Sequence, residues 1–289
     1  MITSTGNSQV RNLVQLKKKA KERRKQQLYI VEGSRMFAEA PLDRIEKIYV
    51  SDTFASDKDH EKLLRGRSYE VLADSVFDYV SDTRTPQGIL CLMRMRPYSL
   101  NDVLSVRSAD AGERPAGRGI GYDKASAERR ESGNGSWLVF ENLQDPGNLG
   151  TMFRTGEGAG ITGVIMDMAT ADIYNPKTIR STMGSIYRVP FLIAEDLQET
   201  LRMMNTRGIR IYASHLEGGV CYDEPDYTTD TAFLIGNEGN GLTPETAAMA
   251  DVNIRIPMCG RLESLNAAMA AGILMYEANR QRRRGSAQA

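Results

Sequence analysis

The chain has 289 residues, 41% of them hydrophobic and 26% charged, a composition typical of a globular protein with one large or two ordinary domains. Its 37 Lys and Arg residues are balanced by 37 Asp and Glu residues, so no whole-molecule charge favours nucleic acid or a membrane as a partner. Three widely spaced cysteines argue against a disulfide framework or a metal site, and no apolar run approaches the roughly 18 residues of a membrane span. We therefore expect a cytoplasmic protein with no membrane partner and no metal.

Basic residues are concentrated near the N-terminus. In residues 11–35, nine Lys and Arg residues stand against two Glu residues. Apolar residues at helical spacing predict a helix over 10–27, and LYIVEG at 28–33 predicts a strand closed by its glycine. Short helices and strands alternate to about residue 96, which indicates a compact α/β domain over 1–104.

The composition changes after this first domain. Residues 105–135 are rich in Gly, Ser, Ala and charged side chains and contain almost nothing to bury. This pattern is typical of a solvated linker, although its Arg and Lys residues also allow a loop that becomes ordered on a partner. We predict a linker here, followed by a second domain over 136–289.

The second domain opens with a strand and continues with alternating helices and strands. Such alternation predicts a mostly parallel sheet that helices cover on both faces. The predicted strands are at 136–143, 163–167, 209–214, 231–236 and 252–257, and the predicted helices are at 148–159, 175–184, 196–208 and 243–250 and near the C-terminus.

Ligands of open α/β sheets bind beyond the carboxyl ends of the strands, and three segments of the second domain carry unusual polar residues there. The first is ENLQDPGNLGTMFRTGEGAG at 141–160, where a turn leads into a helix that carries Asn148 and Arg154. Ordinary helix chemistry explains these two residues equally well, with Asn148 as the N-cap and Arg154 on a solvated face.

The second segment, FLIGNEGNGLTPE at 233–245, places Glu238 among three glycines directly after a predicted strand. Glycines let backbone groups approach a ligand closely, although a tight connection explains any one of them. A carboxylate at this place fits a plain turn less well. The spacing matches neither the dinucleotide-binding nor the phosphate-binding glycine pattern. Thr243 and Pro244 predict the N-cap and the first residue of the next helix.

The third segment, RLESLNAAMAAGILMYEANR at 261–280, begins with polar side chains and continues as an alanine-lined apolar helix that can pack closely against a neighbour. Ser264 is a good N-cap by residue type. Asn266 then lies inside the first turn, where a poor helix former needs a reason. The backbone amides at the start of this helix can also bind part of a ligand.

In this order, the three segments resemble the signature motifs of the SpoU/TrmH family of the SPOUT superfamily, which contains S-adenosylmethionine-dependent RNA ribose 2′-O-methyltransferases. The matching stretches are NLGTMFRT at 148–155, GNEGNGL at 236–242 and IPMCGRLESLN at 256–266. Residues from about 10 to 96, through LYIVEG and TPQGIL, also resemble the L30e-like substrate-binding domain that is often joined to this catalytic domain.

The resemblance implies a SPOUT α/β domain with a parallel sheet and a deep trefoil knot, an exception to the rule that chains do not thread loops. It also implies S-adenosylmethionine as the cofactor, a homodimer and no metal. Three residues would hold the cofactor, mainly through backbone groups, and five polar side chains would form the catalytic site. The cofactor residues are Gly236, Ile256 and Leu265, and the catalytic residues are Asn148, Arg154, Glu238, Ser264 and Asn266.

The arginine that matches Arg154 is described in the family as the catalytic base. A guanidinium stays protonated in proteins, so we expect Arg154 instead to grip the neighbouring phosphate and to stabilise the developing alkoxide. Phosphate or water would then receive the proton. Neither histidine of the chain lies in a motif, so a histidine base is not expected.

The resemblance implies structured RNA as the substrate, and the appended domain favours 23S ribosomal RNA over transfer RNA by family analogy. The basic segment then gains a role, because Lys17, Lys18, Lys21 and Arg24 can contact phosphates, whereas alone it is more simply a solvated helical face. The alternatives are a transfer RNA 2′-O-methyltransferase and a non-enzymatic RNA-binding or ribosome-assembly protein. A dinucleotide-dependent oxidoreductase would need the absent glycine pattern.

Overall fold

Two compact units make up the described part of the protein. The computed structural model describes residues 1–105, 134–215 and 219–285. Unit 1 comprises Met1–Arg96 and Asp172–Tyr187, and unit 2 comprises Pro97–Ala171 and Arg188–Ala289. None of the helices within the described ranges is both long and apolar enough to cross a membrane.

The limits of these units differ from the predicted domain limits at two places. Helix α7 (Leu100–Ser105) belongs to unit 2, where Val103 is fully buried and its carbonyl accepts a hydrogen bond from Trp137 Nε1 at 3.1 Å. The segment Asp172–Tyr187 belongs to unit 1, although its neighbours along the chain on both sides belong to unit 2. The predicted linker at 105–135 lies almost wholly outside the described residues.

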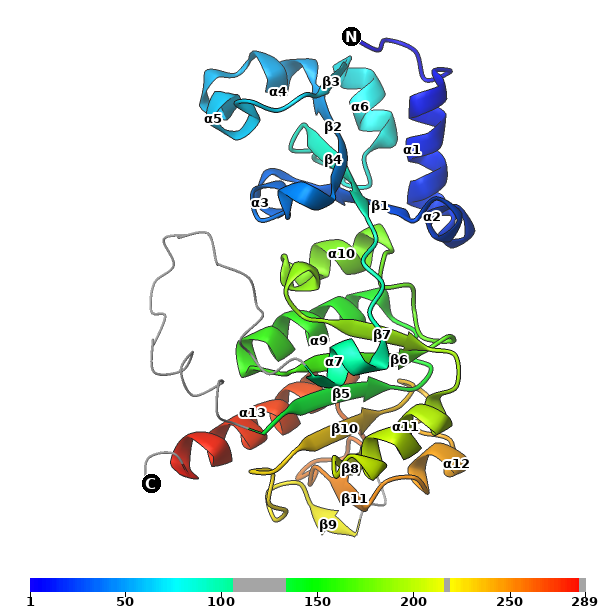
Figure 1. Ribbon diagram of the computed structural model, residues 1–289, viewed down its shortest axis with the longest axis vertical. Coiled ribbons are helices and arrows are strands. Elements are labelled where there is room, and N and C mark those ends of the chain that lie inside the picture. The colour runs from blue at the N-terminus through cyan, green and yellow to red at the C-terminus, as the bar shows by residue number, and fades with distance from the viewer. Residues whose placement is uncertain (106–133, 216–218, 286–289) are drawn as a thin grey trace. The chain divides into compact units, whose positions relative to one another are not determined.

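Unit 1 is a mixed α/β unit (Figure 1). Its strands are β1 (Leu28–Glu32), β2 (Ile45–Ser51), β3 (Glu70–Leu72) and β4 (Ile89–Arg94), in the sheet order β1-β4-β2-β3. Its helices are α1 (Ser8–Lys18), α2 (Ala20–Gln26), α3 (Ser34–Ala38), α4 (Asp52–Ser56), α5 (Glu61–Leu64), α6 (Asp74–Val80) and α10 (Pro176–Thr182). The last of these comes from the segment Asp172–Tyr187, which is termed the inserted segment. Strand β4 pairs antiparallel with β1 and β2, and β2 pairs parallel with β3.

The single helix predicted near the N-terminus is instead two helices, α1 and α2, so this prediction is wrong. Lys19 between them is extended, with φ −121° and ψ 111°. The break brings the buried Arg23 back to the end of α1, where its guanidinium donates to the carbonyls of Leu16 and Lys17 at 2.6 and 3.1 Å. Arg23 thereby satisfies carbonyls that the end of a helix leaves without partners, and it also pairs with Asp172 at 3.0 Å.

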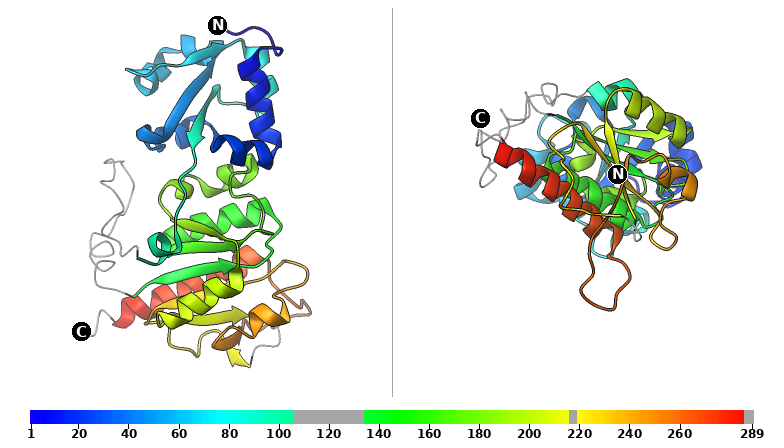
Figure 2. Two further views of the ribbon diagram at one scale, coloured as in Figure 1. Left: turned by 45° about the vertical axis from the view of Figure 1, so that its right-hand side comes forward. Right: turned by 90° about the horizontal axis from the view of Figure 1, so that it is seen from below.

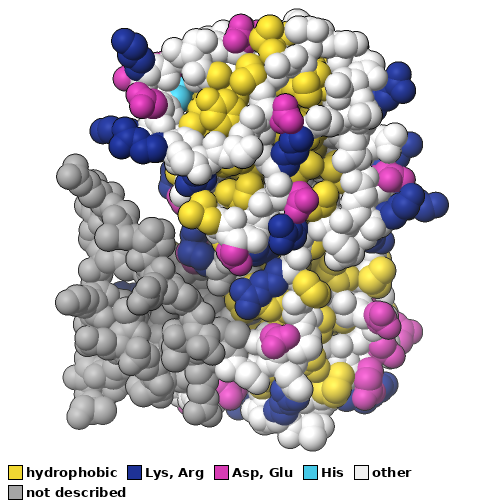
Figure 3. Space-filling model, turned by 45° about the horizontal axis from the view of Figure 1, so that its top comes forward, with side chains coloured by type: hydrophobic (Ala, Val, Ile, Leu, Met, Phe, Trp, Pro, Cys, Tyr) yellow, Lys and Arg dark blue, Asp and Glu magenta, His cyan; other side chains and the backbone are white. Residues whose placement is uncertain are grey.

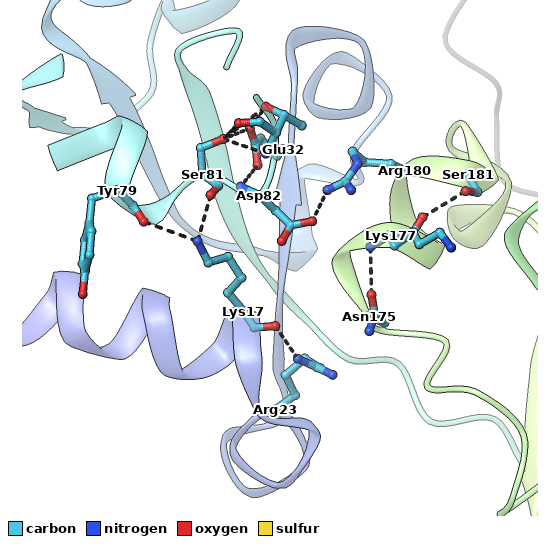
Figure 4. Close-up of polar contacts among 11 residues, drawn as sticks. Lys17, Arg23, Glu32, Tyr79, Ser81, Asp82, Asn175, Lys177, Arg180 and Ser181 are labelled. Atoms are coloured by element: carbon cyan, nitrogen blue, oxygen red, sulfur yellow. Dashed lines mark hydrogen bonds and ion pairs between the residues drawn. The ribbon is translucent and has the colours of Figure 1, made fainter. Parts of the chain in front are cut away.

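Further polar contacts hold the segment Asp172–Tyr187 within unit 1 (Figure 4). Arg180 of α10 pairs with Asp82 at 2.6 Å. Tyr187 donates its hydroxyl to the carbonyl of Met36 at 3.2 Å. Because the paired residues are 98 and 151 positions apart, no local sequence pattern predicts these contacts.

Unit 2 is built on a seven-stranded sheet in which every pair is parallel, which confirms the predicted sheet type. Its strands are β5 (Ser136–Phe140), β6 (Gly163–Asp167), β7 (Phe191–Ala194), β8 (Arg210–Ser214), β9 (Val220–Cys221), β10 (Thr231–Ile235) and β11 (Val252–Arg255). Its helices, besides α7, are α9 (Pro146–Ala159), α11 (Leu197–Thr206), α12 (Pro244–Ala247) and α13 (Ala267–Gly285). The sheet order is β7-β6-β5-β10-β8-β11-β9, and β7 and β9 were not predicted.

Helices cover both faces of this sheet (Figure 1). Trp137 and Val139 of β5 belong to a buried cluster that includes residues of α7 and α11. The alternate residues Leu138 and Phe140 face the opposite side, because side chains alternate along a strand. On that side α9 and α13 pack against each other. The carboxyl ends of the strands are left for the loops that carry the predicted motifs.

Candidate active site

The first two predicted polar segments leave neighbouring strands of the sheet. Strands β5 and β10 are adjacent and parallel, with Phe140 beside Ile235 at their carboxyl ends. The loops at 141–145 and 236–243 therefore begin side by side, as expected for the ligand-binding edge of an open α/β sheet. The third motif, at 256–266, joins β11 to the helix of the third segment, α13.

Glu238 joins the first two loops through its carboxylate. Oε2 accepts a hydrogen bond from the backbone N–H of Gln144 at 2.9 Å, and Oε1 accepts from the backbone N–H of Asp145 at 3.0 Å. Oε1 also accepts from Asn148 Nδ2 at 3.1 Å. Burial by itself raises the pKa of Glu238, but these N–H donors outweigh it and hold the pKa below its ordinary value. At neutral pH the ionised carboxylate therefore positions the loop after β5.

Asn148 and Asn266 extend this contact into the third segment. Asn266 Nδ2 donates to Asn148 Oδ1 at 3.0 Å, and Asn266 Oδ1 accepts from the backbone N–H groups of Ala268 and Met269 at 2.9 and 3.3 Å. Because a carboxylate only accepts, Asn148 must turn its NH2 toward Glu238 and its oxygen toward Asn266. Glu238, Asn148 and Asn266 are termed the amide relay, which joins all three motifs and fixes the orientation of both amides.

The start of α13 corrects the prediction from the sequence. Asn266 is the N-cap and does not lie inside the first turn, and Ser264 is exposed in the preceding segment and does not cap the helix. An Asn at the N-cap can accept from the second and third N–H groups of a helix. Asn266 therefore caps this apolar helix and also belongs to the amide relay.

Helix α9 begins two residues earlier than predicted. Asp145 is its N-cap and accepts from the backbone N–H of Asn148 at 2.7 Å, while Pro146 occupies the first helical position. The alternative that made Asn148 the N-cap is therefore wrong. Because Asp145 caps the helix, the side chain of Asn148 serves the amide relay.

Arg154 is exposed on α9 and is not part of the amide relay. It lies six positions after Asn148, which puts the two side chains roughly 120° apart around the helix axis. Among the described residues, its guanidinium has no hydrogen bond or ion pair. Its N–H donors are therefore available to a partner molecule.

The loop at 236–242 closes tightly on itself. Asn237 and Gly241 exchange two backbone hydrogen bonds of 2.9 Å, and Asn237 Oδ1 accepts from the N–H of Gly239 at 2.9 Å. Gly236 lies so close to the returning backbone that an added Cβ atom would be 2.2 Å from the carbonyl carbon of Gly241. Glycine is required at 236 because two backbone stretches approach each other there.

The segment that leads into α13 offers backbone groups to a ligand. Among the described residues, no hydrogen bond joins the backbone of 257–265 to the rest of the chain. This segment projects from unit 2 as an orange-red loop (Figure 2). Ile256 and Leu265 at its two ends are half-buried. Main-chain groups without protein partners beside apolar side chains fit the adenosine part of S-adenosylmethionine.

One carboxylate that shapes the site, Asp167, was not predicted. It lies at the carboxyl end of β6 and accepts from the backbone N–H of Asn142 with both oxygens, at 3.1 and 3.0 Å. Asn142 is in the left-handed region, with φ 53°, and its carbonyl accepts from Asn237 Nδ2 at 2.8 Å. An acidic residue at the last position of a predicted strand is the signal that points to Asp167.

The predicted RNA-contacting residues differ in their surroundings. Lys17 donates its ammonium group to the carbonyl of Ser81 at 2.8 Å, and burial lowers its pKa (Figure 4). Lys18, Lys21 and Arg24 are exposed. On the face drawn in Figure 3, Lys and Arg side chains are interspersed with Asp and Glu, in keeping with the balanced total charge.

Known protein families match both the region of the three motifs and the N-terminal region. The model of the SpoU rRNA Methylase family matches residues 136–276, and that of the MRM3-like substrate binding domain matches residues 7–91. The chain is 31% identical over 277 residues to the 23S rRNA (guanosine(2553)-2'-O)-methyltransferase RlmP of Bacillus subtilis, a match that covers 95% of this chain and 97% of that protein. The chain belongs to the SpoU methylase family.

Two solved methyltransferase structures have the same fold. The AdoMet-bound rRNA methyltransferase from Sinorhizobium meliloti is 28% identical and has a TM-score of 0.77, over 96% of this chain and 97% of that chain. The SpoU methyltransferase AviRb from Streptomyces viridochromogenes is 25% identical and has a TM-score of 0.78, over 96% of this chain and 99% of that chain. The resemblance found in the sequence and the α/β fold with a substrate-binding region are confirmed, while the knot stays a prediction.

Proposed function

We propose that this SpoU methylase transfers the methyl group of S-adenosylmethionine to a ribose 2′-hydroxyl in 23S ribosomal RNA. The observation that carries the proposal is the amide relay, which joins the three family motifs at the carboxyl edge of the sheet. Similarity over nearly the whole chain to RlmP supports the substrate class. The trefoil knot and the cytoplasmic location expected from the sequence are part of this proposal.

S-adenosylmethionine supplies a methyl group that its sulfonium already activates, so the protein must align the hydroxyl and help to remove its proton. Gly236, Ile256 and Leu265 hold the cofactor through main-chain groups. The oriented amides of the relay and the Ser264 hydroxyl position the ribose. Arg154 stays protonated, binds the RNA phosphate next to the target ribose and stabilises the alkoxide that develops on the 2′-oxygen. Phosphate or water receives the proton of the 2′-hydroxyl.

The proposal is tested by mapping 2′-O-methyl groups on total RNA from cells with and without this gene, and after complementation with wild type or Arg154→Ala. We expect one site in 23S ribosomal RNA to disappear and to return only with wild type. A lost site in transfer RNA would redirect the proposal to that substrate. No lost site, in cells that make the protein, would favour a non-enzymatic role in RNA binding or ribosome assembly.

A homodimer formed through α13 belongs to the same proposal. Met269 and Tyr276 of α13 are 62% and 51% exposed and lie seven residues apart, on one side of the helix. Changing both to Asp is expected to give a monomer in light scattering at a concentration at which the wild type is a dimer, because an interface would bury unpaired charges. Met203→Asp on α11, where Met203 is 39% exposed, is the control that leaves the dimer intact. A dimeric double variant would place the interface elsewhere.

The exposed basic residues Lys18, Lys21 and Arg24 are proposed to contact RNA phosphates. Changing all three to Glu is expected to reduce the slope of log affinity against log salt by about two to three, since each phosphate contact contributes roughly 0.7–0.9. Filter binding over a salt series measures the slope. The matched control makes the same charge change at three other exposed positions of unit 1, Lys58, Lys62 and Arg65. Equal losses for both triple variants would assign the effect to total charge alone.

A further inference from the structure

A second carboxylate joins the same two loops from the opposite direction. Glu141 directly follows β5 and is 8% exposed. Its Oε2 accepts from the backbone N–H of Thr243 at 2.7 Å, and its Oε1 accepts from the Thr243 hydroxyl at 2.7 Å and from the Thr246 hydroxyl. Thr243 is the N-cap of α12 and comes directly after the loop at 236–242.

Glu141 and Glu238 hold each other's loops. Glu238, in the loop after β10, binds backbone N–H groups of the loop after β5. Glu141, at the end of β5, binds the chain where the loop after β10 ends at Thr243. Since β5 and β10 are adjacent parallel strands, each of the two carboxylates binds the loop that follows the neighbouring strand. The site predicted from the sequence contains Glu238 but not Glu141.

The loop at 236–242 is fixed at two points. At one end it continues from Ile235 in the sheet, and at the other end Thr243 is held by Glu141. Within the loop, Gly236 lies against the backbone of Gly241, so a shift at Thr243 displaces the returning backbone relative to Gly236. Without the carboxylate, the N–H and hydroxyl of Thr243 and the buried hydroxyl of Thr246 would lose their acceptor, which favours such a shift.

We propose that Glu141 is a positioning residue for S-adenosylmethionine: it fixes the loop at 236–242 through Thr243 and Thr246 without touching the cofactor. This inference rests on the proposed function, in which the loop holds the cofactor through its backbone. Loss of Glu141 therefore weakens cofactor binding more than it slows methyl transfer at saturating cofactor.

Glu32 of unit 1 provides a matched control. It is 9% exposed and, like Glu141, accepts from one backbone N–H and two hydroxyl groups: those of Asp82 at 3.0 Å, Ser81 at 2.5 Å and Thr83 at 2.7 Å (Figure 4). Glu32→Gln removes a buried carboxylate of the same chemistry at a place outside the loops of unit 2. It separates a general loss of stability from a specific loss of cofactor binding.

The experiment measures the Kd for S-adenosylmethionine by calorimetry on the full chain without RNA, together with the Tm of each variant. Glu141→Gln is expected to raise the Kd about tenfold, and the kcat at saturating cofactor is expected to stay within about threefold of wild type. Glu32→Gln is expected to lower the Tm comparably and to leave the Kd within about twofold of wild type.

Two variants of Thr246, which is 1% exposed, decide the question if Glu141→Gln does not fold. Thr246→Val removes the hydroxyl at nearly constant volume and is expected to raise the Kd, whereas Thr246→Ser keeps the hydroxyl and is expected to bind like wild type. A wild-type Kd in Glu141→Gln or Thr246→Val, or an equal rise in Glu32→Gln, would overturn the inference. A wild-type protein that does not bind S-adenosylmethionine would instead overturn the proposed function.

Discussion

Arg154→Lys is expected to lower the rate of methyl transfer by about a hundredfold, although the variant keeps its positive charge. A guanidinium offers a planar fork of N–H donors that can bind two phosphate oxygens at once, whereas an ammonium group is a single point charge. The fork also supplies a donor to the alkoxide that develops on the ribose. Single-turnover transfer of a labelled methyl group to the RNA measures this rate.

The surroundings of Arg154 predict that Arg154→Lys slows methyl transfer without altering the fold. Its side chain is exposed on α9 and has no partner among the described residues, so the Tm and the Kd for S-adenosylmethionine should match wild type. Arg202→Lys on α11, at a position 56% exposed and paired with Glu199, is the control for a generic arginine change. Near-wild-type turnover in Arg154→Lys would show that charge alone suffices and would reject the proposed fork.

Local patterns predicted the parts of the site that depend on near neighbours. Thr243 and Pro244 were expected to begin a helix, and they are the N-cap and first residue of α12, because a cap acts on N–H groups only three residues away. The role of Glu238 could not be predicted in the same way. Its donors lie 90 to 94 positions away, on a loop that is close only because β5 and β10 are neighbours in the sheet.

The contrast between local patterns and distant contacts also explains where the fold differs from the prediction. The break between α1 and α2 accompanies the burial of Arg23, whose partner Asp172 is 149 positions away in the inserted segment. Strand β7 is a continuous apolar run of four residues, FLIA, and β9 has only two residues, so neither shows a period-2 pattern. Composition and periodicity therefore predicted the type of sheet, whereas the strand order and the insertion depend on contacts between distant residues.

Gly236→Ala is expected to weaken S-adenosylmethionine binding about a hundredfold or more and to lower the Tm by roughly 2–10 °C. The added Cβ would lie 2.2 Å from the carbonyl carbon of Gly241 and 2.4 Å from the nitrogen of Leu242. Both are backbone atoms, so no change of rotamer relieves the overlap and the loop must open. Overpacking of this kind costs about 1–3 kcal/mol of folding free energy, and it moves the main chain that is proposed to hold the cofactor.

Two other glycines of the same loop separate crowding from backbone conformation. An added Cβ at Gly239 would meet Asn237 Oδ1 at 3.5 Å, an ordinary contact, so Gly239→Ala should bind the cofactor within about twofold of wild type. An added Cβ at Gly241 would meet no atom, but φ there is 70°, so Gly241→Ala should cost about 1 kcal/mol of folding free energy. Its Kd for the cofactor should lie between those of Gly239→Ala and Gly236→Ala. Calorimetry and thermal unfolding of the three variants test this order. Equal losses at Gly236 and Gly239 would show that close approach of the backbone is not what the cofactor site requires.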